Sequence, residues 1–194
     1  MPVTTRYTAV AIMLHWLVAL GILVLIGLGL AMVHLPLGPL TQFRLYQLHK
    51  SIGITVLLAG LLRILWRIFH HPPPLPALPR LEKAAAEGMH TLLYVLMVVL
   101  PVTGWALVSV SPFNLPTVLY GLVPWPHLPV LSTLEDKAPV EAVLKFTHGK
   151  LGWLLLVLIV VHVGAALRHH FVLRDGVLRR MLPFATPRTR EKRS

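Results

Sequence analysis

Four long apolar segments constrain this chain more than any other feature of its sequence. They cover about residues 10–33, 46–69, 84–108 and 146–171, and 56% of all residues are hydrophobic. Each segment has about twenty residues or more, which in a helix rising about 1.5 Å per residue crosses a hydrocarbon core of about 30 Å. The sequence therefore predicts an all-α integral membrane protein, a bundle of four transmembrane helices.

Positive charge predicts the orientation of this bundle. If both termini and the loop 70–82 share one side, that side carries thirteen of the eighteen Lys and Arg residues and the other side carries five. Loops rich in Lys and Arg stay in the cytoplasm, so both termini are expected there. The net charge of +11 is then explained by topology and anionic lipid headgroups, and no nucleic-acid partner is expected.

The connections between the segments differ in character. Residues 34–45 form a short link, and 70–82 are rich in proline, which ends a helix. The longest connection, 109–145, is followed without a break by the fourth span, and the stretch TLEDKAPVEAVLKF near its end predicts a short amphipathic helix at the membrane interface. We expect residues 1–175 to form one four-helix domain, and 176–194 to form a basic cytoplasmic tail.

Five histidines lie inside these apolar spans, where an imidazole needs a polar partner that lipid cannot supply. His148 and His162 are fourteen residues apart, about four helical turns and 21 Å of rise, so they share a face of one helix at two membrane levels. His49 should lie at the outer level with His148, and His15 at the inner level with His162. His90 is expected in the inner half of the third helix.

Facing pairs of imidazoles at two levels favour haem iron. The chain has no cysteine, which excludes zinc–thiolate and iron–sulfur sites and covalent haem attachment. Two non-covalent b-type haems fit best. Two axial histidines fill the open positions of the iron and leave one-electron transfer as the natural chemistry.

Residues near the histidines support this interpretation. A small residue one turn later would let a flat porphyrin approach the helix, and four of the five histidines have one: Ala19 after His15, Gly53 after His49, Gly152 after His148 and Ala166 after His162. Tyr94 follows His90, which makes His90 the least suitable ligand. Arg63 is expected at the inner level and could bind haem propionates, as Lys50, Lys150 and Arg44 could at the outer level.

Two other interpretations compete with haem binding. A membrane histidine is often only hydrogen-bonded to a neighbouring helix, and glycines often reflect helix packing. A transporter or metal-ion carrier could use the same histidines, but such proteins often have repeated halves, which this sequence lacks. Four histidines at matched levels, each followed by a small residue, favour haem over both.

The sequence resembles the bacterial di-haem cytochrome b561 family of four-helix inner-membrane proteins. The resemblance covers the chain to about residue 183 and lies in the stretches LHWLVAL, LHKSIGITVLLAGLLRILWR, MHTLLYVLMVVLPVTGW, HGKLGWLLLVLIVVHVGAALRHHF and RDGVLRRMLP. It implies the same ligand pairs, His15 with His162 and His49 with His148, in a multi-pass protein of the bacterial inner membrane. The outer connection 109–145 and the charged tail depart from the family.

The resemblance also implies electron exchange between the outer face and membrane quinone, with ubiquinone expected. Some family members oxidise superoxide at the outer face, and Lys50, Lys145 and Lys150 would attract such an anion. His90 and Tyr94 are candidates for the quinone site because a quinone needs a proton-exchanging group beside a haem. The alternative is a cytochrome b anchor subunit that links a hydrogenase or dehydrogenase partner to the quinone pool.

Overall fold

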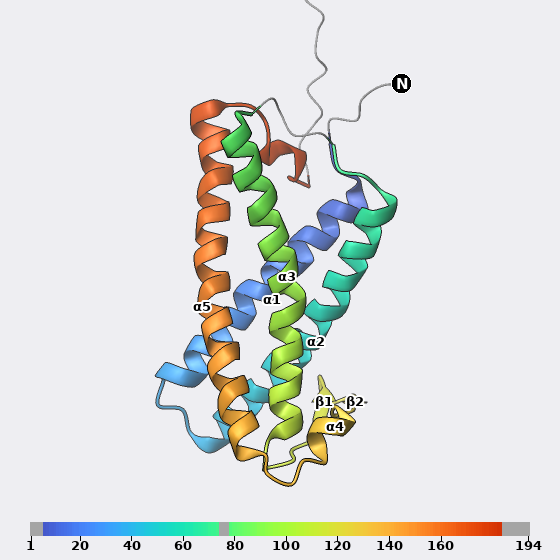
Figure 1. Cartoon of the computed structure of the whole chain (residues 1–194), viewed down its shortest axis with the longest axis vertical. Coiled ribbons are helices and arrows are strands. Elements are labelled where there is room, and N and C mark those ends of the chain that lie inside the picture. Colours follow the sequence, from blue (N-terminus) through green and yellow to red (C-terminus); the bar gives the residue numbers. More distant parts are fainter. Residues whose placement is uncertain (1–5, 74–77, 184–194) are drawn as a thin grey trace, which may run out of the picture.

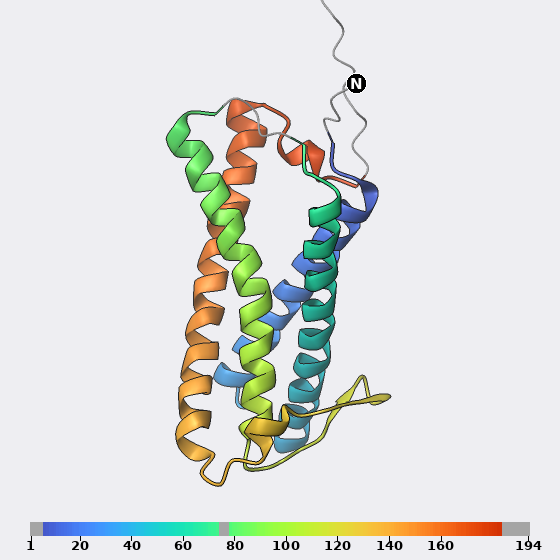
Figure 2. The ribbon, with the colours of Figure 1, turned by 45° about the vertical axis from the view of Figure 1, so that its right-hand side comes forward.

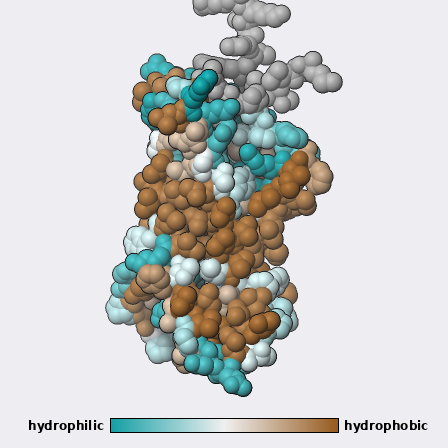
Figure 3. Space-filling model, in the orientation of Figure 1, coloured by the Kyte–Doolittle hydropathy of each residue, from teal (hydrophilic) through white to brown (hydrophobic). Residues whose placement is uncertain are grey.

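The computed structural model describes residues 6–73 and 78–183, and it is dominated by four long helices. Each of them is long and apolar enough to cross a membrane. The face drawn in Figure 3 has a hydrophobic band around its middle and hydrophilic residues towards both ends. The predicted four-helix membrane bundle is therefore confirmed. The helices are α1 (Ala9–His34), α2 (Pro39–Phe69), α3 (Arg80–Val110) and α5 (Ala138–Arg168), as Figure 1 shows.

All four helices begin earlier than predicted, α1 by only one residue. The prediction of an interfacial helix was wrong. The stretch 133–146 does not form a separate interfacial helix, because from Ala138 onward it is the first part of α5. Proline is well tolerated in the first turn of a helix, where its missing N–H costs nothing, so Pro139 starts α5 instead of interrupting it. The Asp136 carboxylate accepts a hydrogen bond of 3.2 Å from the Ala138 N–H at this start.

The helices pack in sequence-neighbour order around a small core. Helix α1 packs on α2, α2 on α3, and α3 on α5, an arrangement visible in Figures 1 and 2. Val18, Val56 and Met97 form a buried cluster where the first three helices meet. Gly21 sits at the crossing of α1 and α2, since a Cβ atom there would lie 2.5 Å from Val56 Cγ2. The close approach of these two helices therefore depends on a glycine.

The connection between α3 and α5 contains a small β-hairpin that the sequence did not predict. Strands β1 (Thr117–Leu119) and β2 (Val123–Trp125) pair antiparallel. The short helix α4 (Pro129–Ser132) follows them. In the turn, Tyr120 has φ 52° and Gly121 has φ 73°, values that glycine adopts easily and tyrosine rarely.

Hydrogen bonds from α2 hold Tyr120 in this conformation. Its backbone N–H donates to Ser51 Oγ at 3.0 Å, and its hydroxyl lies 2.8 Å from Thr55 Oγ1. The hairpin is thereby fixed to α2 at the end of the bundle opposite the termini (Figure 1). We call this the hairpin end, and we call the end that holds Arg6 and Pro183 the basic end.

The last described residues fold back onto the start of α1. The Trp16 indole N–H donates to the carbonyl of Met181 at 2.8 Å. The Arg6 guanidinium donates to the carbonyls of Leu182 and Pro183 at 2.6 and 2.7 Å. Both ends of the described chain therefore lie on one side, as predicted, while residues 184–194 of the expected tail lie outside the described residues.

A hydrogen-bonded histidine–aspartate pair closes the turn that leads into this segment. Helix α5 continues as a π-helical turn, His169–Leu173, before the chain reverses. His169 Nδ1 pairs with Asp175 Oδ2, and the Val177 N–H donates to Asp175 Oδ1 at 3.0 Å. Burial alone would raise the pKa of the Asp175 carboxyl, but the hydrogen bonds from Val177 and His169 outweigh it and lower this pKa.

Replacing Gly21 with alanine should destabilise the bundle. The added methyl group would press on Val56 and force α1 away from α2, and overpacking of this kind costs about 1–3 kcal/mol. Thermal denaturation in detergent measures the effect. Gly27→Ala is the matched control on the same helix, because a Cβ atom there meets nothing within 4 Å. Equal stability of the two variants would show that the crossing is not tight.

Replacing Asp175 with asparagine should loosen residues 169–183. A carboxyl with a lowered pKa stabilises the fold above its ordinary pKa of 3.8, and this contribution disappears as the pH falls through the lowered value. Hydrogen–deuterium exchange, corrected for its intrinsic pH dependence, should show faster exchange in this segment for Asp175→Asn at neutral pH. Asp136→Asn should leave the segment as protected as before, and unchanged exchange in both variants would contradict a role for the pair.

Candidate functional site

Two histidines meet at the hairpin end of the bundle. His49 of α2 and His148 of α5 have ring centroids 6.3 Å apart, with 71° between the ring planes. Two imidazoles that bind one metal ion from opposite sides, each at about 2 Å, have centroids about 6 Å apart. This pair was predicted from the sequence, and its spacing suits one metal ion between the two rings.

The two histidines of this pair differ in their hydrogen-bond partners. His148 Nδ1 lies 3.1 Å from Thr103 Oγ1, whereas His49 Nδ1 is buried and has no hydrogen-bond partner among the described residues. A buried ring nitrogen without a partner is costly in hydrocarbon. The His49 ring therefore keeps a nitrogen that no described residue of the protein satisfies.

Glycines border the pair on three helices. A Cβ atom at Gly53 or at Gly152, one turn beyond each histidine, would meet nothing within 4 Å. At Gly29 of α1 it would lie 3.8 Å from His49 Cε1, in ordinary contact. The two predicted small residues therefore face open space, as a flat group beside the helix requires.

A second histidine group lies towards the basic end. His90 of α3 and His162 of α5 have ring centroids 5.6 Å apart at 69°. His15 of α1 contacts its neighbour Trp16 edge to face at 5.4 Å, and it lies within electrostatic range of His162, His90 and Arg63. The structure thus brings His15 and His162 to one level, as predicted, but the ring in contact with His162 is that of His90.

Two arginines of α2 add positive charge at this level. Arg63 donates to the Ala11 carbonyl at 2.9 Å, one turn before His15 on α1. The guanidinium carbons of Arg63 and Arg67 lie 5.6 and 5.4 Å from the centre of the Tyr94 ring. Neither arginine forms an ion pair with a carboxylate in the described parts of the chain. Their charge is therefore available to an anionic group.

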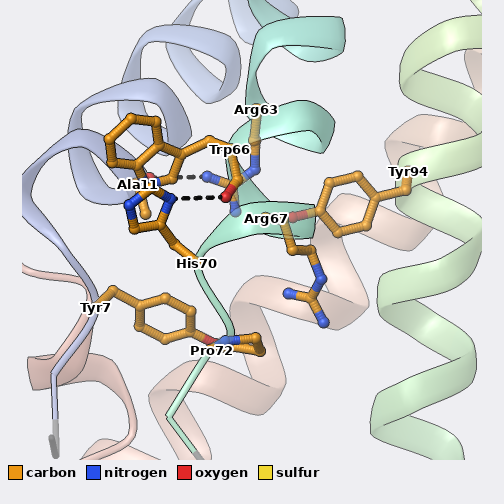
Figure 4. A pocket seen from close by; sticks show the side chains of 8 residues that line it. All are labelled: Tyr7, Ala11, Arg63, Trp66, Arg67, His70, Pro72 and Tyr94. Carbon is orange, nitrogen blue, oxygen red and sulfur yellow. Dashed lines mark hydrogen bonds between the residues drawn. The ribbon is translucent and has the colours of Figure 1, made fainter.

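These arginines line a small hollow between α1, α2 and α3, drawn in Figure 4. Tyr94 and the stacked pair of Trp66 and His70, whose centroids are 3.9 Å apart, line it as well. Its volume is about 20 Å³, enough for a water molecule but too small for a quinone ring. A larger ligand at this level would have to approach Tyr94 from outside the hollow.

The predicted lysines of the hairpin end contact other groups. Lys50 donates to the Pro116 carbonyl at 3.3 Å, which helps to hold the connection before β1. Lys150 lies over the Phe146 ring at 5.4 Å and is exposed. Lys50 is therefore partly used by the fold, whereas Lys150 remains accessible at the surface.

No three side chains of His, Cys, Asp or Glu cluster closely enough to hold a metal ion within residues 6–73 and 78–183. The protein supplies imidazoles in facing pairs, and a pair leaves most of the coordination sphere to another molecule. A haem supplies four equatorial nitrogens and takes two axial ligands from the protein. The residues present therefore fit a bis-histidine haem better than a bare metal ion.

Comparison with known proteins identifies the family. The family model described as prokaryotic cytochrome b561 matches residues 6–184. This chain belongs to that family. It is accordingly a multi-pass protein of the bacterial inner membrane, and the family is one of haem-binding transmembrane electron-transfer proteins.

Several curated relatives match over nearly their full length. Cytochrome b561 homolog 2 of Escherichia coli K12 is 34% identical over 91% of both chains. Cytochrome b561 homolog 1 of the same strain is 26% identical over 92% of this chain and 97% of its own. A Yersinia pestis protein named probable superoxide oxidase CybB is 29% identical over 92% of this chain and 96% of its own.

Sequence reasoning missed three residues of these sites. Thr103 and Gly104 contact His148 from α3, and Arg67 lies with Arg63 over Tyr94. Arg67 could have been found, because it follows Arg63 by one helical turn and must share its face. Thr103 and Gly104 lie in a stretch quoted for the family resemblance, but only the packing of α3 on α5 brings them to His148.

Proposed function

We propose that this protein transfers electrons across the bacterial inner membrane through two b-type haems, each held by two histidines. The observation that carries the proposal is the placement of imidazole pairs at two membrane levels. His49 faces His148 at the hairpin end, and His162 lies with His15 and His90 towards the basic end. The charge distribution assigns the hairpin end to the outer side.

The inner pair is proposed as His15 and His162, with His90 beside it. Helix α1 carries Ala19 one turn after His15, whereas Tyr94 occupies the corresponding position after His90 and is engaged by Arg63 and Arg67. Space for a flat group is therefore expected at His15. His90 contacts His162 in the fold, whether or not it binds the iron.

A bound b-type haem with two histidine ligands supplies reversible one-electron oxidation and reduction. The paired histidines would bind it, and the neighbouring cations would orient it. Arg63 and Arg67 form no ion pair with a carboxylate of residues 6–73 or 78–183, and their charge suits carboxylates such as haem propionates. Lys50 and Lys150 are the cations proposed for the same role at the outer level.

The proposed electron acceptor is ubiquinone, bound near His90 and Tyr94. Reduction of one quinone to quinol requires two electrons and two protons, and His90 and the Tyr94 hydroxyl can exchange protons at this level. Because the hollow beside Tyr94 holds only about one water, the quinone is expected to approach from the lipid side of α3.

The proposed outer donor is superoxide, which makes the protein a superoxide:ubiquinone oxidoreductase. One superoxide loses one electron and becomes dioxygen, so two superoxide anions reduce one quinone. The support is the Yersinia pestis relative named a probable superoxide oxidase and the positive charge of Lys50, Lys145 and Lys150, which attracts an anion. Oxygen release together with quinol formation upon superoxide addition, two oxygen molecules per quinol, tests this donor, and oxygen release without quinol formation would contradict it.

Single alanine substitutions should assign the haem ligands. The wild-type protein should carry two haems per chain, measured by pyridine haemochrome and by a reduced-minus-oxidised spectrum. Each of the variants His15→Ala, His49→Ala, His148→Ala and His162→Ala should carry one or fewer, because an axial bond is lost. His127→Ala, in the hairpin connection, should keep both.

His90→Ala decides between two inner ligand pairs. If His90→Ala retains two haems, the inner ligands are His15 and His162. If His90→Ala loses one haem while His15→Ala keeps both, the inner ligands are His90 and His162. A wild-type protein that stays colourless when haem is supplied would refute the proposal as a whole.

Tyr94→Phe should slow electron exchange with ubiquinol while leaving the haem spectrum intact. The variant keeps the ring that supports both arginines and removes only the hydroxyl, and loss of a proton-exchanging group commonly costs about 100-fold or more. Stopped-flow reduction of the oxidised protein by a short-chain ubiquinol measures the rate. Tyr46→Phe, an exposed tyrosine on α2, is the control, and an unchanged rate in Tyr94→Phe would exclude its hydroxyl from the quinone site.

A further inference from the structure

We propose that Thr103 is a positioning residue for His148, fixing the ring tautomer that leaves Nε2 free to bind the outer haem iron. The inference rests on the proposed function, because it assigns a role beside one of the proposed axial ligands. The carrying observation is that the His148 ring lies against two hydrogen-bonded oxygens of α3, the Thr103 hydroxyl and the Leu100 carbonyl, both of which can accept from a ring N–H.

The direction of these hydrogen bonds follows from the number of hydrogens. A threonine hydroxyl has one hydrogen to donate, and a carbonyl oxygen can only accept. Thr103 Oγ1 lies 2.7 Å from the Leu100 carbonyl oxygen, so its hydrogen is used there. Towards His148 Nδ1, at 3.1 Å, Oγ1 can therefore offer only a lone pair, and Nδ1 must carry the hydrogen.

A neutral imidazole carries one ring hydrogen, so placing it on Nδ1 leaves the lone pair on Nε2. That is the form in which Nε2 binds a metal. The opposite tautomer would turn an N–H towards the iron and leave Nδ1 facing an oxygen lone pair. Thr103 therefore disfavours the tautomer that cannot bind.

Gly104 fixes the position of the same ring. A Cβ atom at Gly104 would lie 3.0 Å from His148 Cε1 and 3.4 Å from Nδ1. The first distance is closer than carbon atoms approach without displacement, so only glycine lets the ring lie this near α3. Two consecutive residues of α3 thus act on one ring of α5, one by its hydroxyl and one by the absence of a side chain.

The proposed partner ligand has no such support. His49 Nδ1 is buried without a hydrogen-bond partner in the described residues. A hydrogen bond from the distal N–H of a ligating histidine raises the basicity of the metal-bound nitrogen and stabilises the oxidised metal. Thr103 is therefore expected to lower the reduction potential of the outer haem through His148 alone.

The test compares Thr103→Val, Thr103→Ser and wild type as haem-loaded proteins. Thr103→Val keeps the shape and removes the acceptor, so the outer haem should show a higher reduction potential and be lost about 10-fold more readily. The potential of the inner haem should not change. Thr103→Ser restores the hydroxyl and should restore the wild-type potential, and spectroelectrochemical titration with a haem-retention assay gives both readouts.

Thr91→Val is the matched control. Its hydroxyl also bonds within α3, to the Glu87 carbonyl at 2.9 Å, but it lies on the exposed part of the helix away from His148. It should change neither potential. The inference is supported if the reduction potential of the outer haem rises in Thr103→Val, stays at the wild-type value in Thr91→Val, and returns to it in Thr103→Ser.

Two results would overturn it. If Thr103→Val retains both haems with unchanged potentials and retention, the hydroxyl does not act on the ligand, although the proposed function stands. If Thr103→Ser behaves like Thr103→Val, including a shared loss of the outer haem, the effect comes from side-chain packing at position 103 and not from the hydroxyl, which serine retains. Absence of haem from the wild-type protein would instead remove the proposed function itself.

Discussion

Hydrocarbon offers no hydrogen-bond partner, so polar groups within the four spans depend on partners inside the bundle. The histidines show how this constraint shapes the structure. His148 is met by a hydroxyl from α3, and His162 meets the ring of His90. Arg63 reaches a backbone carbonyl of α1. Polar contacts between different helices are therefore made at the levels of the histidines and Arg63, and those levels are also where the proposed cofactors would bind.

The two ends of the bundle meet this constraint in different ways. At the hairpin end, the β-hairpin is fixed to α2 by side-chain hydrogen bonds, and Lys50 holds the connection before it. At the basic end, two arginines without carboxylate partners in the described parts of the chain lie over one tyrosine ring. Each end thus uses some of its positive charge in the fold and keeps some available, at Lys150 of the hairpin end and at Arg63 and Arg67 of the basic end.

Much of this architecture was predictable because the membrane imposes simple rules. Apolar length predicted the four helices, and a spacing of fourteen residues predicted that His148 and His162 lie at two levels. Helix starts were less predictable, since polar first turns such as the one at Ala138 carry no hydropathy signal. The hairpin, the Thr103 contact and the closeness of His90 to His162 depend on how separate helices pack, which no local pattern in one chain encodes.

The attachment of the final residues to α1 has a consequence for synthesis. Trp16 and Arg6 bond to carbonyls that lie 165 to 177 positions later in the chain. At ribosomal rates of about 5–20 residues per second, the first helix leaves the ribosome on the order of 10 to 30 seconds before these partners exist. During that interval the indole and guanidinium must be satisfied by water, lipid headgroups or the insertion machinery. Closure of this end therefore has to wait until residues 181–183 are synthesised, long after the first helix has entered the membrane.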